Sequence, residues 1–97
     1  MNKQDYLDNL EQYIHEPEKH DFGDEIIPVA MWLRNFMPGD DHFSPYNHSS
    51  MWIKTAVADI VDVSINDITR LMILNGYSLG GTATSPEWIM QAIDDIG

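Results

Sequence analysis

The chain contains no cysteine among its 97 residues. It therefore has no disulfide framework, no thiolate metal ligand and no cysteine nucleophile. This composition suits a reducing compartment, and we expect the protein in the cytoplasm. No apolar run approaches the roughly 18 residues that a membrane-spanning helix needs. The polar segment 1–13 also lacks the hydrophobic stretch of a signal peptide. The sequence predicts no association with a membrane.

Basic residues are scarce. Five Lys and Arg stand against 16 Asp and Glu, which gives a net charge of −11 at pH 7. Residues 1–41 hold ten acids and three bases, and so carry −7 of that charge. Because a DNA duplex presents a negative charge about every 1.7 Å along its axis, it should repel such a chain. We therefore do not expect direct binding to nucleic acid, and we expect a partner protein with a basic surface.

The hydrophobic content, by contrast, is that of a folded protein. It amounts to 43% and includes three Trp, four Tyr and three Phe. A disordered acidic tail would contain fewer aromatic residues. Residues 1–97 match the size of one domain, long enough to enclose a modest core.

Periodicity and capping residues predict an all-α domain of four or five short helices. Asn2 can cap a first helix that ends at Glu16-Pro17, and Ser49-Ser50 can begin a third. A fourth helix should begin at Ser64 or Asn66 and end at Asn75-Gly76. Segment 26–36 is almost wholly apolar, with Pro28 suited to a first helical turn. It is predicted as a buried helix, with a buried strand as the open alternative.

A last helix is predicted from Ser85 as its cap and Pro86 as its first residue. Its inner side would carry five apolar residues. These are Trp88, Ile89, Ala92, Ile93 and Ile96.

Segment 56–72 resembles a DNA-binding helix-turn-helix. Ala58 falls where the first helix must be small, and Ile68 falls where the second needs a buried aliphatic residue, although Asp62 replaces the usual turn glycine. Lys54 and Arg70 are the only bases nearby, which is a poor match to a phosphate backbone. The alternative function is therefore a transcriptional regulator that binds DNA as a dimer. It would use Asn66, Thr69 and Arg70.

A second resemblance covers about a third of the chain. Small uncharacterised proteins of phages, prophages and integrative elements carry a Ser-Ser-aromatic-x-Leu-Lys start, a Val-Ser-Asn turn and a Gly-Tyr end. The present sequence departs from this pattern at Met51-Trp52 and at Thr55. The resemblance implies a mobile-element origin and no particular reaction. Its matching residues are Ser49, Ser50, Ile53, Lys54, Val63, Ser64, Asn66, Met72, Gly76 and Tyr77.

Catalytic and metal-binding patterns are weak. The segment 39–48, with its two Asp and two His, is the only cluster of metal-type ligands, and it lacks the spacing of known metal signatures. Ser49 and Ser50 next to His48 have the wrong geometry for a triad, and helix capping explains them. We expect no catalytic residues, no metal and no cofactor, and so a protein that is not an enzyme.

The chain is thus predicted to act by binding another protein. The most specific form is an anti-defence protein, such as an anti-CRISPR or a DNA mimic, that inhibits a nucleic-acid-binding protein of the host. Met51 and Trp52 follow a helix cap and cannot both point inward together with Ile53, so at least one should lie at the surface. Whether charge or an apolar anchor dominates binding stays open, as does a homodimer. The candidate partner-binding residues are Asp21, Asp24, Glu25, Asp40, Asp41 and Trp52.

Overall fold

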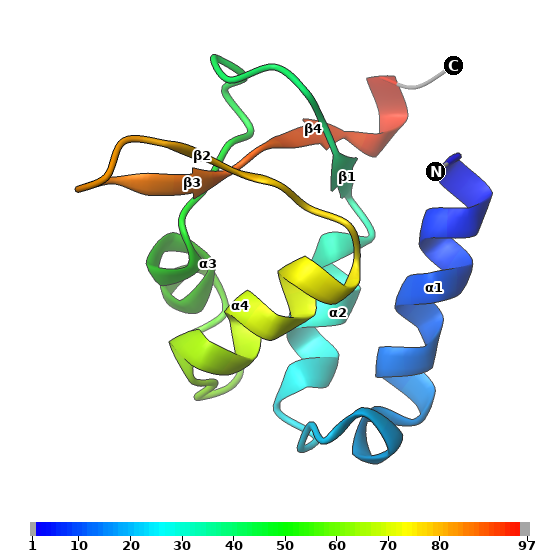
Figure 1. Ribbon diagram of the computed structural model, residues 1–97. Helices are drawn as coiled ribbons and strands as arrows, with labels where there is room; N and C mark the ends of the chain where they lie inside the picture. The colour runs from blue at the N-terminus through cyan, green and yellow to red at the C-terminus, as the bar shows by residue number, and fades with distance from the viewer. Residues whose placement is uncertain (1, 96–97) are drawn as a thin grey trace.

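Four α-helices and two small antiparallel sheets make up the fold in the computed structural model, which describes residues 2–95 (Figure 1). The helices are α1 (Lys3–His15), α2 (Ile26–Leu33), α3 (Ser50–Ala56) and α4 (Ile65–Leu74), with 3-10 turns at Pro17–His20 and Ile93–Asp95. The strands are β1 (Phe36–Pro38), β2 (Leu79–Gly81), β3 (Pro86–Trp88) and β4 (Met90–Ala92). β1 pairs with β4, and β2 pairs with β3.

The predicted all-α class is therefore wrong, and the error lies mainly after residue 78. The segment predicted as a last helix forms β3, β4 and a 3-10 turn, while Ile96 lies outside the described residues. The backbone N–H of Trp88 donates to the carbonyl of His48 at 2.8 Å, and Phe36 pairs with Ala92. Pairing with these residues, which are distant in sequence, overrides the local preference of the segment for a helix. Pro86 fits because proline is tolerated as the first residue of a strand.

Helices α1, α3 and α4 begin where the sequence predicts. The side chains of Asn2, Ser49 and Ser64 each accept a hydrogen bond from a backbone N–H three residues later, at 2.8, 3.0 and 3.1 Å. α4 ends before Gly76, which adopts a φ of 86° that other residues rarely adopt. Segment 26–33 is helical, so the buried strand is excluded there, although Phe36 belongs to β1.

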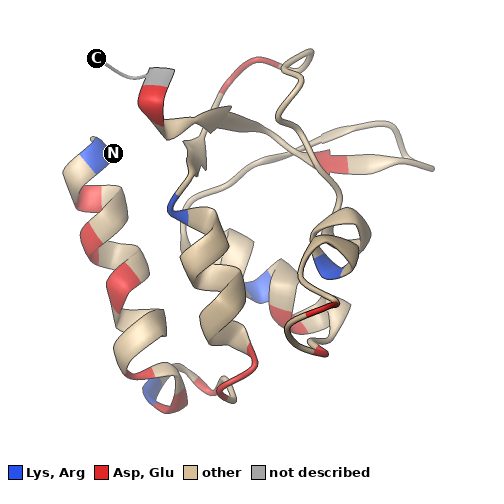
Figure 2. Cartoon of the chain, turned by 180° about the vertical axis from the view of Figure 1, so that it is seen from behind, with Lys and Arg blue, Asp and Glu red and all other residues tan. Residues whose placement is uncertain are grey.

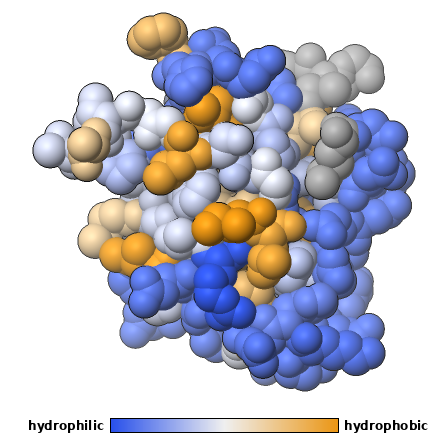
Figure 3. Space-filling model, in the orientation of Figure 1, coloured by the Kyte–Doolittle hydropathy of each residue, from blue (hydrophilic) through white to orange (hydrophobic). Residues whose placement is uncertain are grey.

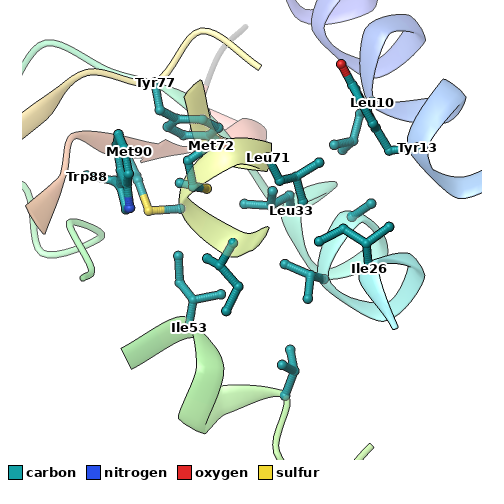
Figure 4. Close-up of a cluster of buried hydrophobic side chains, with 14 of the residues drawn as sticks. Leu10, Tyr13, Ile26, Leu33, Ile53, Leu71, Met72, Tyr77, Trp88 and Met90 are labelled. Atoms are coloured by element: carbon teal, nitrogen blue, oxygen red, sulfur yellow. The ribbon is translucent and has the colours of Figure 1, made fainter. Parts of the chain in front are cut away.

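One core unites these elements. Figure 4 shows Leu10 from α1, Leu33 from α2, Ile53 from α3 and Leu71 from α4 converging, all fully buried, with strand residues closing one side. Such burial contributes about 1.5–3 kcal/mol per large aliphatic side chain. Trp88 from β3 and Met90 from β4 belong to the same core (Figure 4). The core thereby fixes α3 against both α4 and the strands.

The helix-turn-helix-like pair is present without the tight turn. α3 and α4 pack against each other, but α3 ends at Ala56, and residues 57–64 form a longer connector that contains Ala58. The ammonium of Lys54 bonds the carbonyl of Val63 at 2.6 Å and the carboxylate of Asp62 at 3.0 Å, which fastens this connector to α3. Asp62 therefore does not serve as the turn residue between two adjoining helices.

No helix within residues 2–95 combines the length and the apolar character that crossing a membrane requires.

Candidate functional site

Five ring-bearing side chains gather on one part of the surface, and we call them the aromatic cluster. They come from the end of α2, the start of β1, the loop before α3 and the first turn of α3, and therefore from four successive segments that the core holds together. The cluster consists of Trp32, Phe36, Tyr46, His48 and Trp52.

Within the aromatic cluster, His48 and Trp52 stack face to face, with ring centroids 3.7 Å apart and an interplanar angle of 7°. Trp32 lies 6.0 Å from Trp52 and 4.7 Å from Phe36, tilted by 43° in both cases. Phe36 in turn lies 6.2 Å from Tyr46. Aromatic pairs of this kind contribute about 0.5–1.5 kcal/mol beyond their burial. The cluster is thus a preordered surface whose side chains have already lost much of their freedom.

The aromatic cluster remains accessible to a partner. Trp52 is 47% exposed and the neighbouring Met51 is 56% exposed, whereas Ile53 is fully buried. The prediction that at least one of Met51 and Trp52 lies at the surface is confirmed. Phe43, in the loop 39–47 that supplies Tyr46, is 94% exposed. Exposed aromatic side chains such as Trp52 and Phe43 are typical of protein-binding surfaces, because large aromatic side chains dominate binding energy.

His48 is the one histidine of the aromatic cluster. Its backbone is fixed by the bond from Trp88, and burial of the ring lowers its pKa, while nearby Glu87 acts in the opposite direction. The imidazole is therefore neutral at pH 7. A neutral ring stacks on Trp52 without adding a positive charge to the surface.

Acidification should test this arrangement. Because the folded state disfavours protonated His48, the unfolded chain binds more protons in the window from pH 6.5 down to the lowered pKa. This contribution to stability is thus complete above pH 6.5 and falls as the pH drops through that window. In the variant His48→Gln, the decline in melting temperature between pH 7 and pH 5 should be smaller than in the wild type. Equal declines would contradict the assignment.

The predicted acidic residues fall into two groups. Asp40 and Asp41 are exposed on the loop 39–47, where the Asp41 carboxylate accepts a bond from the N–H of Phe43 at 2.9 Å. These two acids therefore lie on the same loop as Phe43 and Tyr46. Asp21, Asp24 and Glu25 lie at the other end of α2, before its first residue (Figures 1 and 2). The structure does not bring this second group to Trp52.

Asp21 has a local role that the sequence did not reveal. It adopts a left-handed conformation with φ of 61°, and its carbonyl accepts a bond from Arg70 at 3.3 Å. The guanidinium of Arg70 also bonds the carbonyl of His20 and the carboxylate of Asp67, and it lies 4.3 Å from the ring centre of Phe22. Arg70 thus fastens the connector between α1 and α2 to α4.

Paired bases leave little positive surface in the described chain. Carboxylates neutralise Lys19, Arg34, Lys54 and Arg70, through Glu16, Glu11, Asp62 and Asp67 respectively. The two bases that the DNA-binding interpretation needs are Lys54 and Arg70, and both are also bonded to backbone carbonyls. This geometry gives no support to a phosphate-binding surface on α4.

Two features of the surface were not predicted from the sequence. Figure 2 shows acids along α1, where Asp5, Asp8 and Glu11 recur every three residues, a spacing that could have been noticed. Arg34 bonds Glu11 and lowers its pKa, so the row is partly neutralised at that end. The roles of Trp32 and His48 in the aromatic cluster had no comparable signal, because their neighbours come from other segments.

Metal-type ligands do not converge in the described residues, where no three His, Asp or Glu side chains form a group suited to a metal ion. His48 turns to Trp52, whereas His42 lies against the β2–β3 hairpin, with its Nδ1 3.0 Å from the position that a Cβ on Gly80 would occupy. The two histidines of the segment 39–48 therefore contact different parts of the protein and do not face one common site.

Comparisons with known proteins give no relatives: no protein-family model, curated protein or solved structure matches the chain. The class of protein is therefore described from its own fold and candidate site. It is a small, strongly acidic protein of helices and short strands that exposes an ordered aromatic cluster beside an acidic loop.

Proposed function

We propose that the protein binds another protein, without catalysis, through the aromatic cluster and the loop 39–47. The single observation that supports this most is the half-exposed Trp52 stacked on His48, beside a loop that presents Asp40, Asp41 and Phe43 to solvent. Anchoring side chains that are already ordered lose little freedom on binding, which favours affinity.

The negative charge of the chain indicates that the partner has a basic surface. A net charge of −11 attracts basic surfaces over long distances and can raise association rates by one to three orders of magnitude at low salt. At the contact itself, Lys or Arg of the partner can pair with Asp40 and Asp41. A cation over the Trp52 ring adds about 0.5–2 kcal/mol. The partner we propose is a protein with a basic surface that belongs to a bacterial host. The two proteins would bind each other in the host cytoplasm.

The finer form of the proposal is inhibition of a nucleic-acid-binding defence protein by a phage or mobile-element product. Its support is the motif resemblance of residues 49–77 together with the acidity of the chain. The acids along α1 would strengthen competition with nucleic acid for a basic channel, because carboxylates can occupy positions that phosphates use.

Binding should depend on salt and on the acidic loop. With a host protein that the immobilised chain captures and mass spectrometry identifies, we expect affinity to fall at least roughly tenfold between 50 and 300 mM NaCl. The double variant Asp40→Asn with Asp41→Asn should slow association several-fold more than the matched pair Asp21→Asn with Asp24→Asn, as surface plasmon resonance can measure. If the Asp21 pair has the larger effect, the site lies at the other end of α2.

The anti-defence form has a separate test. Expressing the chain in bacteria with active nuclease-based immunity should raise the plating efficiency of a targeted phage, and Trp52→Ala should cancel the gain. An unchanged plating efficiency in hosts with different immune systems would reject the anti-defence form. It would not contradict the proposal that the protein binds another protein.

No observation favours the DNA-binding alternative, since Lys54 and Arg70 are held by intramolecular bonds. A shift of duplex DNA in a gel at 50 mM salt that is lost with Arg70→Ala would restore it.

A further inference from the structure

A groove lies between the start of α3, one face of α4 and the β2–β3 hairpin. Its volume is about 790 Å³, within the roughly 300–1,000 Å³ that small-molecule sites in proteins usually have. Met51 lines this groove, whereas the adjacent Trp52 belongs to the aromatic cluster, none of whose residues lines the groove. The groove is therefore a second concave surface, distinct from the proposed protein-binding site.

Apolar side chains form most of the groove wall. Tyr77 and Trp88 lie buried at its back, and Figure 3 shows apolar groups gathered on this face of the molecule. Covering such side chains is favourable because it removes apolar surface from water. The apolar residues that line the groove and are exposed are Met51, Ile65, Ile73 and Leu79.

The groove wall carries little charge. Glu87 is the only charged residue among the described residues that line it. Glu87 precedes Trp88 in β3, and successive side chains of a strand point to opposite faces, so its carboxylate and the buried indole of Trp88 emerge on opposite faces of the hairpin. Because burying an ion without a partner is costly, this wall favours a neutral ligand over an ionic one.

A short chain of hydrogen bonds in the wall ends in a free donor. The indole N–H of Trp88 donates to the hydroxyl of Ser50 at 2.9 Å, and the hydroxyls of Ser50 and Thr69 bond each other at 2.9 Å. The bond between the two hydroxyls uses one of their two hydrogens, and within residues 2–95 neither hydroxyl has a further partner. Because a hydroxyl that accepts a bond becomes a stronger donor, Ser50 donates to Thr69. The hydrogen of Thr69 is then free for an acceptor in the groove.

We propose that this groove binds a neutral, largely apolar small molecule whose carbonyl oxygen accepts a hydrogen bond from Thr69. Ile65 and Ile73 lie four residues before and four residues after Thr69 on α4, so the three side chains share one face of the helix. The free donor is therefore flanked by apolar side chains on both sides. This arrangement matches a ligand that has one polar oxygen between apolar parts.

Fluorescence titration of the purified chain with prodan, a neutral naphthalene dye with one ketone, tests the site. We expect saturable one-to-one binding with a blue-shifted emission. Thr69→Val should weaken prodan binding roughly threefold to tenfold, the usual effect of one lost hydrogen bond. The same variant should leave unchanged the binding of N-phenylnaphthylamine, a neutral dye of similar size without an oxygen atom. Thr69→Ser, which keeps the hydroxyl, should bind prodan as the wild type does.

A pair of glutamate variants shows whether the dyes occupy this groove. Ile73→Glu places a carboxylate at a lining residue and should weaken the binding of both dyes at least roughly tenfold. The matched control Ile60→Glu changes a residue that is 74% exposed outside the groove, and it should leave both affinities unchanged. Circular dichroism should show the wild-type fold in every variant. No saturable binding of prodan by the wild type, or equal effects of the two glutamate variants, would overturn the site. An equal effect of Thr69→Val on both dyes would overturn the role of Thr69 as donor to the ligand.

Discussion

Replacing Trp88 by alanine is expected to lower the free energy of unfolding by about 3–5 kcal/mol, the usual cost of removing a buried aromatic side chain. Trp88 is 4% exposed, and its indole N–H donates to the hydroxyl of Ser50 at 2.9 Å. Its backbone N–H bonds His48, so one residue joins β3 both to α3 and to the segment before it. For a domain of this size the melting temperature should fall by more than about 12 °C.

Urea denaturation followed by circular dichroism measures this loss. Trp52→Ala is the matched control, because the same substitution at a half-exposed position should cost only about 1–2 kcal/mol, mainly through the lost ring contacts with His48 and Trp32. Trp88→Phe should cost about 1–2 kcal/mol, mainly through the lost bond to Ser50. A loss below 1 kcal/mol for Trp88→Ala would mean that the strands do not pack on α3 as described.

Replacing Trp52 by alanine is expected to weaken binding to the partner at least roughly 30-fold while leaving the fold intact, because Trp at the centre of an interface commonly contributes 2 kcal/mol or more. The side chain supplies a large exposed area that its stacking on His48 holds in place. Isothermal titration calorimetry with the captured host protein measures the change.

The control for Trp52 is Ile60→Ala, which removes an even more exposed apolar side chain from the connector between α3 and α4. Its effect should stay below about threefold. Trp52→Phe should recover part of the affinity, since a smaller ring can still stack on His48. Equal losses for Trp52→Ala and Ile60→Ala would argue against an aromatic anchor.

Local signals in the sequence were sufficient to predict where α1, α3 and α4 begin and where α4 ends. Asn2, Ser49 and Ser64 cap because their side chains reach backbone groups only three residues away, and Gly76 stops α4 through its own conformation. The strands depend on partners far along the chain, such as Phe36 for Ala92 and His48 for Trp88. Single-sequence periodicity cannot detect such pairs, and the pattern that begins Ser85-Pro86 imitated a helix start.

The candidate site shows the same division. Exposure of Met51 and Trp52 followed from the position of the cap and the burial of Ile53, so it could be predicted. The separation of Asp21 from Asp40 could not be predicted, because it is α2 that places their two loops at its opposite ends (Figure 1). The stacking of His48 on Trp52 depends on the path of the chain between β1 and α3. It had no signature in the spacing of the residues.

Photo-cross-linking at residue 43 shows whether the loop 39–47 contacts the partner protein. Phe43 is 94% exposed on the loop of the proposed site, so p-benzoylphenylalanine can replace it with little change of shape. Irradiation in host extract should join the chain to one basic protein from position 43, and the yield should fall when Trp52 is also replaced by alanine. The same photoreactive residue at position 60 should give no such product. A product of equal yield from position 60 and none from position 43 would contradict the proposed binding surface.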